Sequence, residues 1–133
     1  MIKLINNNIS VLTAGQIIPF NLKFSTNNNI KFDSVANALE YRKAGKYKID
    51  VNIPVTATAV GEVTIALYNN GVIIPETQRT FNFTTVGDKA TYVINDIESV
   101  ILDILAQDYA RITVVTNAPC SVINTEVVSF EIR

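Results

Sequence analysis

The side chains that carry most enzyme chemistry are scarce in this sequence. Among its 133 residues there is no His and a single Cys, Cys120. Histidine is the commonest general base and metal ligand, and a nucleophilic Ser, Thr or Cys needs a base beside it. Zinc clusters and internal disulfides need several thiols. We therefore expect no catalytic residue, no cofactor and no metal site, and predict that the protein is not an enzyme.

The carboxylates offer the next possible chemistry. Asp96 lies close to Glu98 in the sequence, and Asp103 and Asp108 flank a turn. A calcium ion needs six to eight oxygen ligands, and a glycosidase needs two carboxylates across a cleft. The five glycines are scattered and form no phosphate-binding loop. We interpret these acids as solvated loop ends, with a carbohydrate-binding enzyme domain as a lesser alternative.

Cys120 and the tyrosines each allow two interpretations. Cys120 follows Pro119 in a turn region, and is either a redox or intersubunit thiol or an ordinary small residue at a strand end. No basic residue close in sequence would lower its pKa, which favours the second interpretation. The tyrosines form either a saccharide or receptor surface or, as we favour, packing in the core or between subunits, since tyrosine buries its ring and keeps its hydroxyl paired. They are Tyr41, Tyr47, Tyr68 and Tyr109.

Composition limits the class of protein and its partners. Charged residues make up 17% and hydrophobic residues 48%, with a net charge of −1. Such a chain is not a disordered tail, and it has no electrostatic attraction for nucleic acid or an acidic membrane. Apolar runs such as Val100-Ile101-Leu102 are too short to span a bilayer, and the N-terminus is too short and polar for a signal peptide. We expect one domain, residues 1–133, with residues 1–8 as a short N-terminal arm.

The abundant residues indicate β-structure. The 18 Ile, 15 Val and 13 Thr favour half-buried strands, and clusters among the 15 Asn favour turns. The clearest pattern is Lys46–Thr56, in which Tyr47 and every second residue to Val55 are apolar. A second run follows Gly61, and Asn70-Gly71 is the favoured pair for a tight hairpin.

Further candidate strands extend along the chain. In one of them, Gln16–Phe24, the residues Ile18, Phe20, Leu22 and Phe24 share a face. Asp96–Ala106 fits a strand or a helix, and the neighbouring sequence favours a strand. Together these segments predict an all-β antiparallel sandwich of about eight to ten strands. The remaining candidates are Ile9–Thr13, Ile30–Asp33, Ala38–Arg42, Val72–Ile74, Thr80–Thr84, Thr91–Ile94, Tyr109–Thr116 and Val122–Arg133.

Three segments, in this order and spacing, carry a resemblance to a known superfamily. They are Ala44–Ile49 before the long strand, the hairpin Ile65–Ile74, and Ser99–Ile112. Together they resemble the jelly-roll domains of the complement C1q and tumour necrosis factor superfamily, in particular its bacterial and phage branch. The resemblance covers roughly residues 9–132. The sequence departs from the pattern at 106–108, where Gly-Asp is usual, and at 127–132, where an aromatic-glycine motif is usual.

This resemblance implies a jelly-roll sandwich that assembles as a homotrimer and binds partners. We predict a structural or adhesive protein on a phage virion exterior, assembled in the host cytoplasm: a capsid decoration, head fibre or tail-fibre tip. Its expected partners are other copies of itself, virion proteins, and a host-surface receptor or glycan. The alternative is a ligand-binding C1q-like module on a bacterial cell or spore surface. The expected interface residues are Tyr47, Tyr109, Val115 and Val127.

Overall fold

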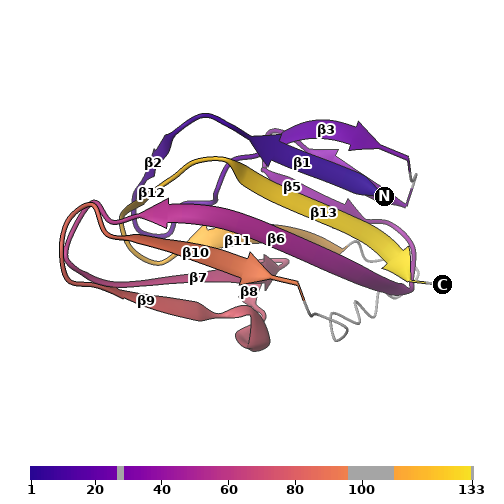
Figure 1. The fold of residues 1–133 in the computed structure, drawn as a ribbon. Coiled ribbons are helices and arrows are strands. Elements are labelled where there is room, and N and C mark those ends of the chain that lie inside the picture. The colour runs from indigo at the N-terminus through magenta and orange to yellow at the C-terminus, as the bar shows by residue number, and fades with distance from the viewer. Residues whose placement is uncertain (27–28, 96–109, 133) are drawn as a thin grey trace.

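The computed structural model describes residues 1–26, 29–95 and 110–132, and it is built almost entirely of β-strands. Two antiparallel sheets pack against each other, which confirms the predicted all-β sandwich (Figure 1). The strands are β1 (Ile2–Asn6), β2 (Ser10–Leu12), β3 (Asn21–Ser25), β4 (Ile30–Asp33), β5 (Ala38–Tyr41), β6 (Lys46–Thr56), β7 (Gly61–Asn69), β8 (Val72–Ile73), β9 (Arg79–Phe83), β10 (Lys89–Ile94), β11 (Ala110–Thr116), β12 (Cys120–Val122) and β13 (Thr125–Ile132), with one short 3₁₀ helix, η1 (Pro75–Thr77).

Strands distant in sequence are neighbours in both sheets. The first sheet has the order β2-β12-β6-β13-β1-β3, and β10 pairs with the other edge of β6. The second sheet has the order β4-β5-β11-β7-β8, and β9 also pairs with β7. In Figure 1 the first sheet is in front, with β13, β6 and β10 crossing the view side by side.

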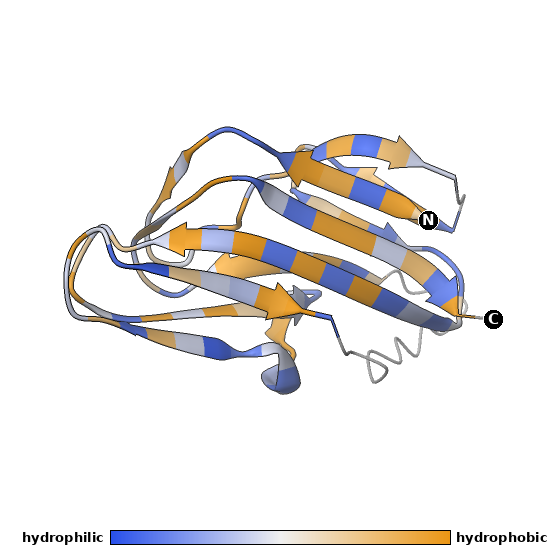
Figure 2. Cartoon of the chain, viewed as in Figure 1, coloured by the Kyte–Doolittle hydropathy of each residue, from blue (hydrophilic) through white to orange (hydrophobic). Residues whose placement is uncertain are grey.

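Strand β6 forms the centre of the first sheet. Tyr47, Ile49, Val51, Ile53 and Val55 are all buried, as the sequence predicts. The residues between them are more exposed, and Figure 2 shows the alternation as orange and blue bands along β6. This period of two places one face of the strand against the second sheet and the other toward solvent.

The predicted hairpin between β7 and β8 is confirmed. Val63, Ile65 and Leu67 of β7 are buried, and the chain reverses at Asn70-Gly71. Both turn residues have positive φ, 50° and 81°. Asn tolerates the left-handed region and Gly adopts it freely, so this pair fits a two-residue turn whose twist matches the flanking strands.

The N-terminal arm predicted for residues 1–8 is wrong, because Ile2–Asn6 is strand β1. It pairs with β13 on one edge and with β3 on the other. Ile2 and Leu4 alternate with Lys3 and Ile5, and both are buried in the core. The apolar alternation is only five residues long and follows the initial Met, so the sequence signal is weak.

The single strand predicted for Gln16–Phe24 is also wrong, because this segment changes sheets. Ile17 forms only an isolated bridge with Val115, and the amide of Ile18 donates to the carbonyl of Val114 in the second sheet. After Pro19, which has no amide hydrogen to continue a ladder, strand β3 joins the first sheet beside β1.

The crossing also divides the apolar face predicted for this segment. Ile18 and Phe20 lie in the core, whereas Leu22 and Phe24 remain 51% and 38% exposed.

The other predicted strands that fall on described residues are present with shifted ends. The stretch Val122–Arg133 contains the end of β12 and all of β13. In β13, Val127 and Ser129 are buried, whereas Val128 and Phe130 lie on the opposite, half-exposed face. Asp96–Ala106 and Tyr109 lie outside the described residues. Within the described ranges, no helix is long and apolar enough to cross a membrane.

The alternation in β6 predicts unequal effects of one introduced charge. Ile53→Asp would place an unpaired carboxylate in the core and should destabilise the fold by about 4 kcal/mol or more. Thr56→Asp, facing outward beside Lys89, should change stability by less than about 0.5 kcal/mol. Urea unfolding of both variants measures the difference, and equal losses would contradict the alternation.

Candidate functional site

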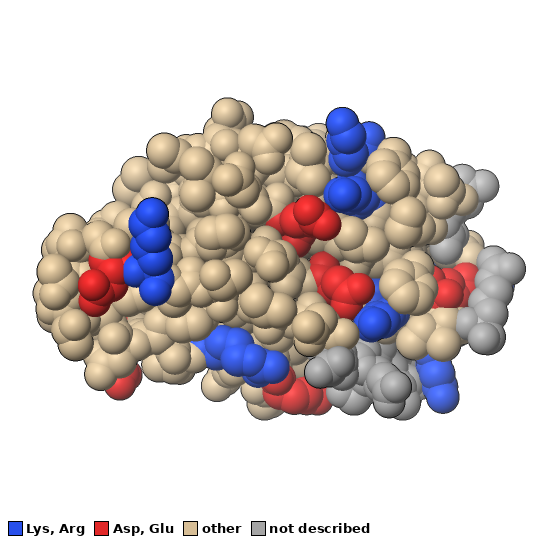
Figure 3. All heavy atoms as spheres, viewed as in Figure 1, with Lys and Arg blue, Asp and Glu red and all other residues tan. Residues whose placement is uncertain are grey.

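The outer face of the first sheet combines exposed apolar side chains with charges that pair within the face. We define it by one set of residues on five strands. These are Lys3 and Ile5 of β1, Phe24 of β3, Lys48, Asp50 and Asn52 of β6, Val93 of β10, and Glu126, Val128 and Phe130 of β13. Figure 3 shows this face, on which uncharged atoms cover most of the area between separate groups of charge.

The strand register arranges these side chains in rows across the sheet. In one row Lys3 lies between Phe24 and Val128, and Val128 lies opposite Asp50. In the next row the order is Ile5, Glu126, Asn52 and Val93. Residues directly opposite each other on one face of antiparallel strands are in contact range, so apolar and charged groups are mixed across the face.

The four charges at the centre of this face are compensated within the face itself. The Nζ of Lys3 is 3.7 Å from an oxygen of Glu126, and the Nζ of Lys48 is 3.8 Å from Oδ1 of Asp50. The Nζ of Lys48 also lies 6.0 Å from the ring centre of Phe130, within range of a cation–π contact. The centre of the face has no net charge from these groups, so it does not repel a copy of itself.

A shallow hollow of about 270 Å³ lies on this face where β10, β6 and β13 meet. Asp50, Asn52 and Glu126 provide its polar lining, and Val93 and Val128 provide apolar lining. The Oδ1 atom of Asp50 is buried here and accepts no hydrogen bond from the described residues. The Nζ of Lys48, 3.8 Å from this oxygen, compensates its charge without forming a hydrogen bond.

Beneath this face a hydrogen-bonded pair of side chains connects the two sheets. The hydroxyls of Tyr41 on β5 and Ser129 on β13 are 2.7 Å apart, and the hydroxyl of Ser129 donates to the carbonyl of Lys48 at 2.8 Å. Tyr41 also packs edge-on against Tyr47, with ring centres 4.8 Å apart. These contacts hold β6 and β13 in register, and so hold the outward residues of both strands in place.

Burial changes the acidity of two tyrosines in the core. It raises the pKa of Tyr41 well above its usual range, and the hydrogen bond with Ser129 only partly opposes this effect. It raises the pKa of Tyr92 similarly, and that hydroxyl donates a hydrogen bond to the carbonyl of Thr77. Both hydroxyls therefore stay protonated in the folded protein at neutral pH.

The structure does not bring the predicted interface residues together. Tyr47 and Val127 are buried in the core of the single chain, whereas Val115 is half-buried on the outer side of the second sheet. Tyr109 lies outside the described residues. The packing role favoured for the tyrosines is confirmed for Tyr41 and Tyr47. The assignment of a subunit interface to these residues stays a prediction.

Only some of the exposed apolar residues of the first sheet can be recognised from the sequence pattern. Val127-Val128 is apolar on both faces of a strand, and the structure places Val127 inside and Val128 outside. Phe130 follows on the same outer face. Periodicity places Phe24 on the same face as Ile18 and Phe20, because it does not reveal the change of sheet near Pro19.

The described residues contain no group of three or more potential metal ligands. The thiol of Cys120 is buried and lies 3.6 Å from the hydroxyl of Thr116. Burial raises the pKa of this thiol, which makes it a poor nucleophile because the thiolate is the reactive form. Its environment is that of a core residue at a strand end.

Comparison with known proteins identifies no family for this chain. No family model matches the sequence, and no curated protein matches it. Among solved structures, an acetyl xylan esterase from the rumen bacterium Butyrivibrio proteoclasticus is similar, with a TM-score of 0.36 and 11% sequence identity. The match covers 96% of this chain and 31% of that one, so the chain spans about a third of its length. At this level of similarity nothing about function follows.

Burial of Tyr41 and Tyr92 predicts a loss of stability at alkaline pH. An unfolded tyrosine ionises near pH 10, whereas the folded protein holds these two protonated. Their contribution is complete below about pH 10 and is lost as pH rises above that value. Urea unfolding between about pH 8 and 11 should show this fall, and the Tyr41→Phe, Tyr92→Phe double variant should show a shallower one. An unchanged slope in that variant would contradict burial as the cause.

Proposed function

We propose that this chain is a jelly-roll domain of the C1q and tumour necrosis factor type. The strand order supports the proposal. The first sheet contains the sequence β1-β13-β6-β10 and the second contains β5-β11-β7-β9. Numbered along the chain, these eight strands alternate between the sheets as 1-8-3-6 and 2-7-4-5, which is the winding of two Greek keys into a jelly roll.

The proposed activity is self-association rather than catalysis, and the outer face of the first sheet is the observation that carries it. The face exposes Phe24, Phe130 and two valines, yet its central charges are already paired. Exposed apolar patches mark interaction sites, and in a cyclic trimer such a patch meets a different surface of the neighbouring copy. A face that mixes apolar groups with charges paired among themselves can supply contact area without a net charge that would repel the neighbour.

The number of subunits we propose is three, from the resemblance of the sequence to trimeric jelly rolls. Three copies around one axis form a closed particle, which leaves no unpaired surface for further addition. A stable contact of this kind buries more than about 1,000 Å². The hollow beside Asp50 would then receive a donor side chain from the neighbouring subunit.

We place this trimer on the exterior of a phage virion, as a capsid decoration, head fibre or tail-fibre tip. A protein assembled in the reducing host cytoplasm cannot depend on disulfides. The single thiol of this chain, buried and hydrogen-bonded, is compatible with that origin. Its role is to contact other virion proteins or the host surface.

One pair of valine substitutions tests the assembly. Val128→Asp adds a carboxylate opposite Asp50 on the proposed interface, and should dissociate the trimer without unfolding the domain. Val72→Asp makes the same change at a 68% exposed position of β8 in the second sheet, and should leave the trimer intact.

Sedimentation equilibrium at micromolar concentration measures both outcomes. The wild type and Val72→Asp should have about three chain masses, against 14.6 kDa for one chain. A wild-type mass of one chain that does not change on concentrating would refute self-association. Dissociation by both variants would show that the first sheet is not the specific interface.

The virion location has a separate test. The proposal expects the chain among the proteins of purified virions, at a copy number divisible by three. Antibodies against it should label intact particles in electron micrographs. A chain detected in infected or producing cells but absent from purified particles would refute the virion role, whatever its oligomeric state.

A further inference from the structure

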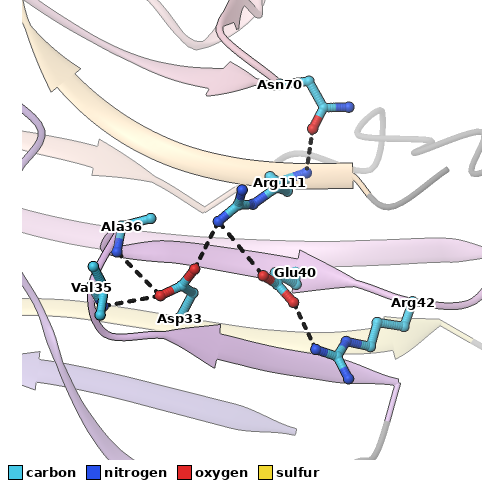
Figure 4. A network of polar contacts seen from close by, with 7 residues as sticks. All are labelled: Asp33, Val35, Ala36, Glu40, Arg42, Asn70 and Arg111. Carbon is cyan, nitrogen blue, oxygen red and sulfur yellow. Dashed lines mark hydrogen bonds and ion pairs between the residues drawn. The ribbon is translucent and has the colours of Figure 1, made fainter.

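A network of charged side chains lies on the outer face of the second sheet, opposite the proposed interface. Figure 4 shows Asp33 of β4, Glu40 of β5 and Arg111 of β11 converging, with Arg42 at the side. The Nη2 of Arg111 is 2.8 Å from Asp33 Oδ2 and 3.6 Å from Glu40 Oε1. The Nη2 of Arg42 is 2.8 Å from Glu40 Oε2. The network itself has two cations and two anions, and Lys31 of β4, directly opposite Glu40 on the same sheet face, adds a third cation beside it.

The backbone holds the two ends of this network in place. Oδ1 of Asp33 accepts hydrogen bonds from the amides of Val35 and Ala36, at 3.0 and 3.2 Å. These bonds lower the pKa of Asp33, and Arg111 lowers it further, so the carboxylate is ionised at neutral pH. On the other side, the amide of Arg111 donates to Oδ1 of Asn70 at 3.1 Å. The polar groups are therefore ordered before any ligand arrives.

This ordered network still has unused hydrogen-bonding capacity. The Arg111 side chain as a whole is 43% exposed, whereas its Nε is buried without a hydrogen-bond partner among the described residues, so a ligand would have to bind the other guanidinium nitrogens. The carboxylate oxygens of Asp33 and Glu40 can each accept more than one hydrogen bond. Donors and acceptors thus alternate at a solvent-accessible site.

An aromatic ring lies on the same sheet face beside these groups. Tyr68 of β7 pairs directly with Thr113, two residues after Arg111. Its side chain is therefore the diagonal neighbour of Arg111, within reach of a long or aromatic side chain. Of the tyrosines described, Tyr41, Tyr47 and Tyr92 are buried, whereas Tyr68 is half-exposed.

We propose that Tyr68, Arg111, Asp33 and Glu40 form a binding site for a neutral saccharide. Neighbouring hydroxyls of a sugar both donate and accept hydrogen bonds, as this alternating network requires. The C–H face of a sugar ring packs against an aromatic ring. An anionic ligand would meet the carboxylates of Asp33 and Glu40, and a cationic ligand would meet the two guanidinium groups and Lys31, so these mixed charges favour a ligand without a charge of its own.

This inference extends the proposed function by naming the class of host-surface ligand. It relies on that function only for its biological setting, because each chain carries a whole site on the sheet that the trimer leaves free. Three sites on one particle would raise the apparent affinity for a dense glycan surface. The site itself does not require the trimer.

Two substitutions within the network test the site, with a third as control. Arg111→Lys keeps the charge but removes the planar fork of donors, and Tyr68→Ala removes the ring. Each should weaken saccharide binding at least about tenfold, or about 1.4 kcal/mol. Asn82→Ala, at an exposed position on β9 of the same sheet, should leave binding unchanged. Urea unfolding checks that all three variants remain folded.

The probes are neutral oligosaccharides of hexoses and N-acetylhexosamines, with their sialylated counterparts, first immobilised and then titrated free in solution. At least one neutral probe should bind, with affinity unchanged between about 0.05 and 0.5 M NaCl. Binding of no probe, binding of sialylated probes alone, or full retention in Arg111→Lys and Tyr68→Ala would overturn the site. Solution titration does not depend on oligomeric state, so a monomer that binds would refute the trimer and support the site.

Discussion

The burial of one side of β6 is the constraint on which the rest of the structure depends. Its inward residues fill the space between the sheets, so the strand has only one acceptable orientation. Strands β13 and β10 pair with its two edges, and their registers follow from it. A slip of β13 by one residue would bury Val128 and Phe130 and expose Val127. The outer face of the first sheet is therefore a consequence of how β6 packs inward.

Polar groups inside the sandwich make this arrangement more specific. Ser129 is fully buried on β13 at a position where an apolar residue would suit the core equally well. Its hydroxyl bridges Tyr41 of the opposite sheet and the carbonyl of Lys48. Thr77 of η1 has a similar role, because its hydroxyl donates to Ile74 and accepts from the amide of Leu67. A buried hydroxyl with satisfied partners disfavours any other register, since a shift would leave it unpaired.

Local sequence patterns predicted the elements whose burial is regular. The alternation of β6 and β7 and the turn at Asn70-Gly71 were all recognisable, because each depends on neighbouring residues alone. The failures share a different physical cause. Strand β1 is short, and Pro19 marks a change of sheet, so both depend on partners far away in sequence.

Both candidate sites depend on contacts between residues that are far apart in sequence, as β1 and the change of sheet at Pro19 do. Nothing near Arg111 in the sequence indicates that Asp33 and Glu40, more than seventy residues earlier, lie beside it. The apolar character of Val127-Val128 was evident, but which of the two faces solvent was decided by Ser129 and its partners in other strands. The apolar residues could therefore be recognised from the sequence. Which surfaces they form could be predicted only once the order of the strands in each sheet was known.

The ion pairs on the two outer faces of the sandwich differ in their lengths and in how firmly they are held. This difference supports a separate proposed role for each face. On the first sheet the charged pairs are single contacts of 3.7 and 3.8 Å, at lengths where side chains readily exchange partners. Such pairs can be rearranged when a second copy covers them, and apolar groups beside them supply the contact area. On the second sheet the contacts of 2.8 Å are fixed by backbone amides around Asp33 and by Asn70. An ordered polar surface loses little conformational entropy when it binds a small ligand. The first face thus suits self-association, and the second suits recognition of a ligand by each subunit.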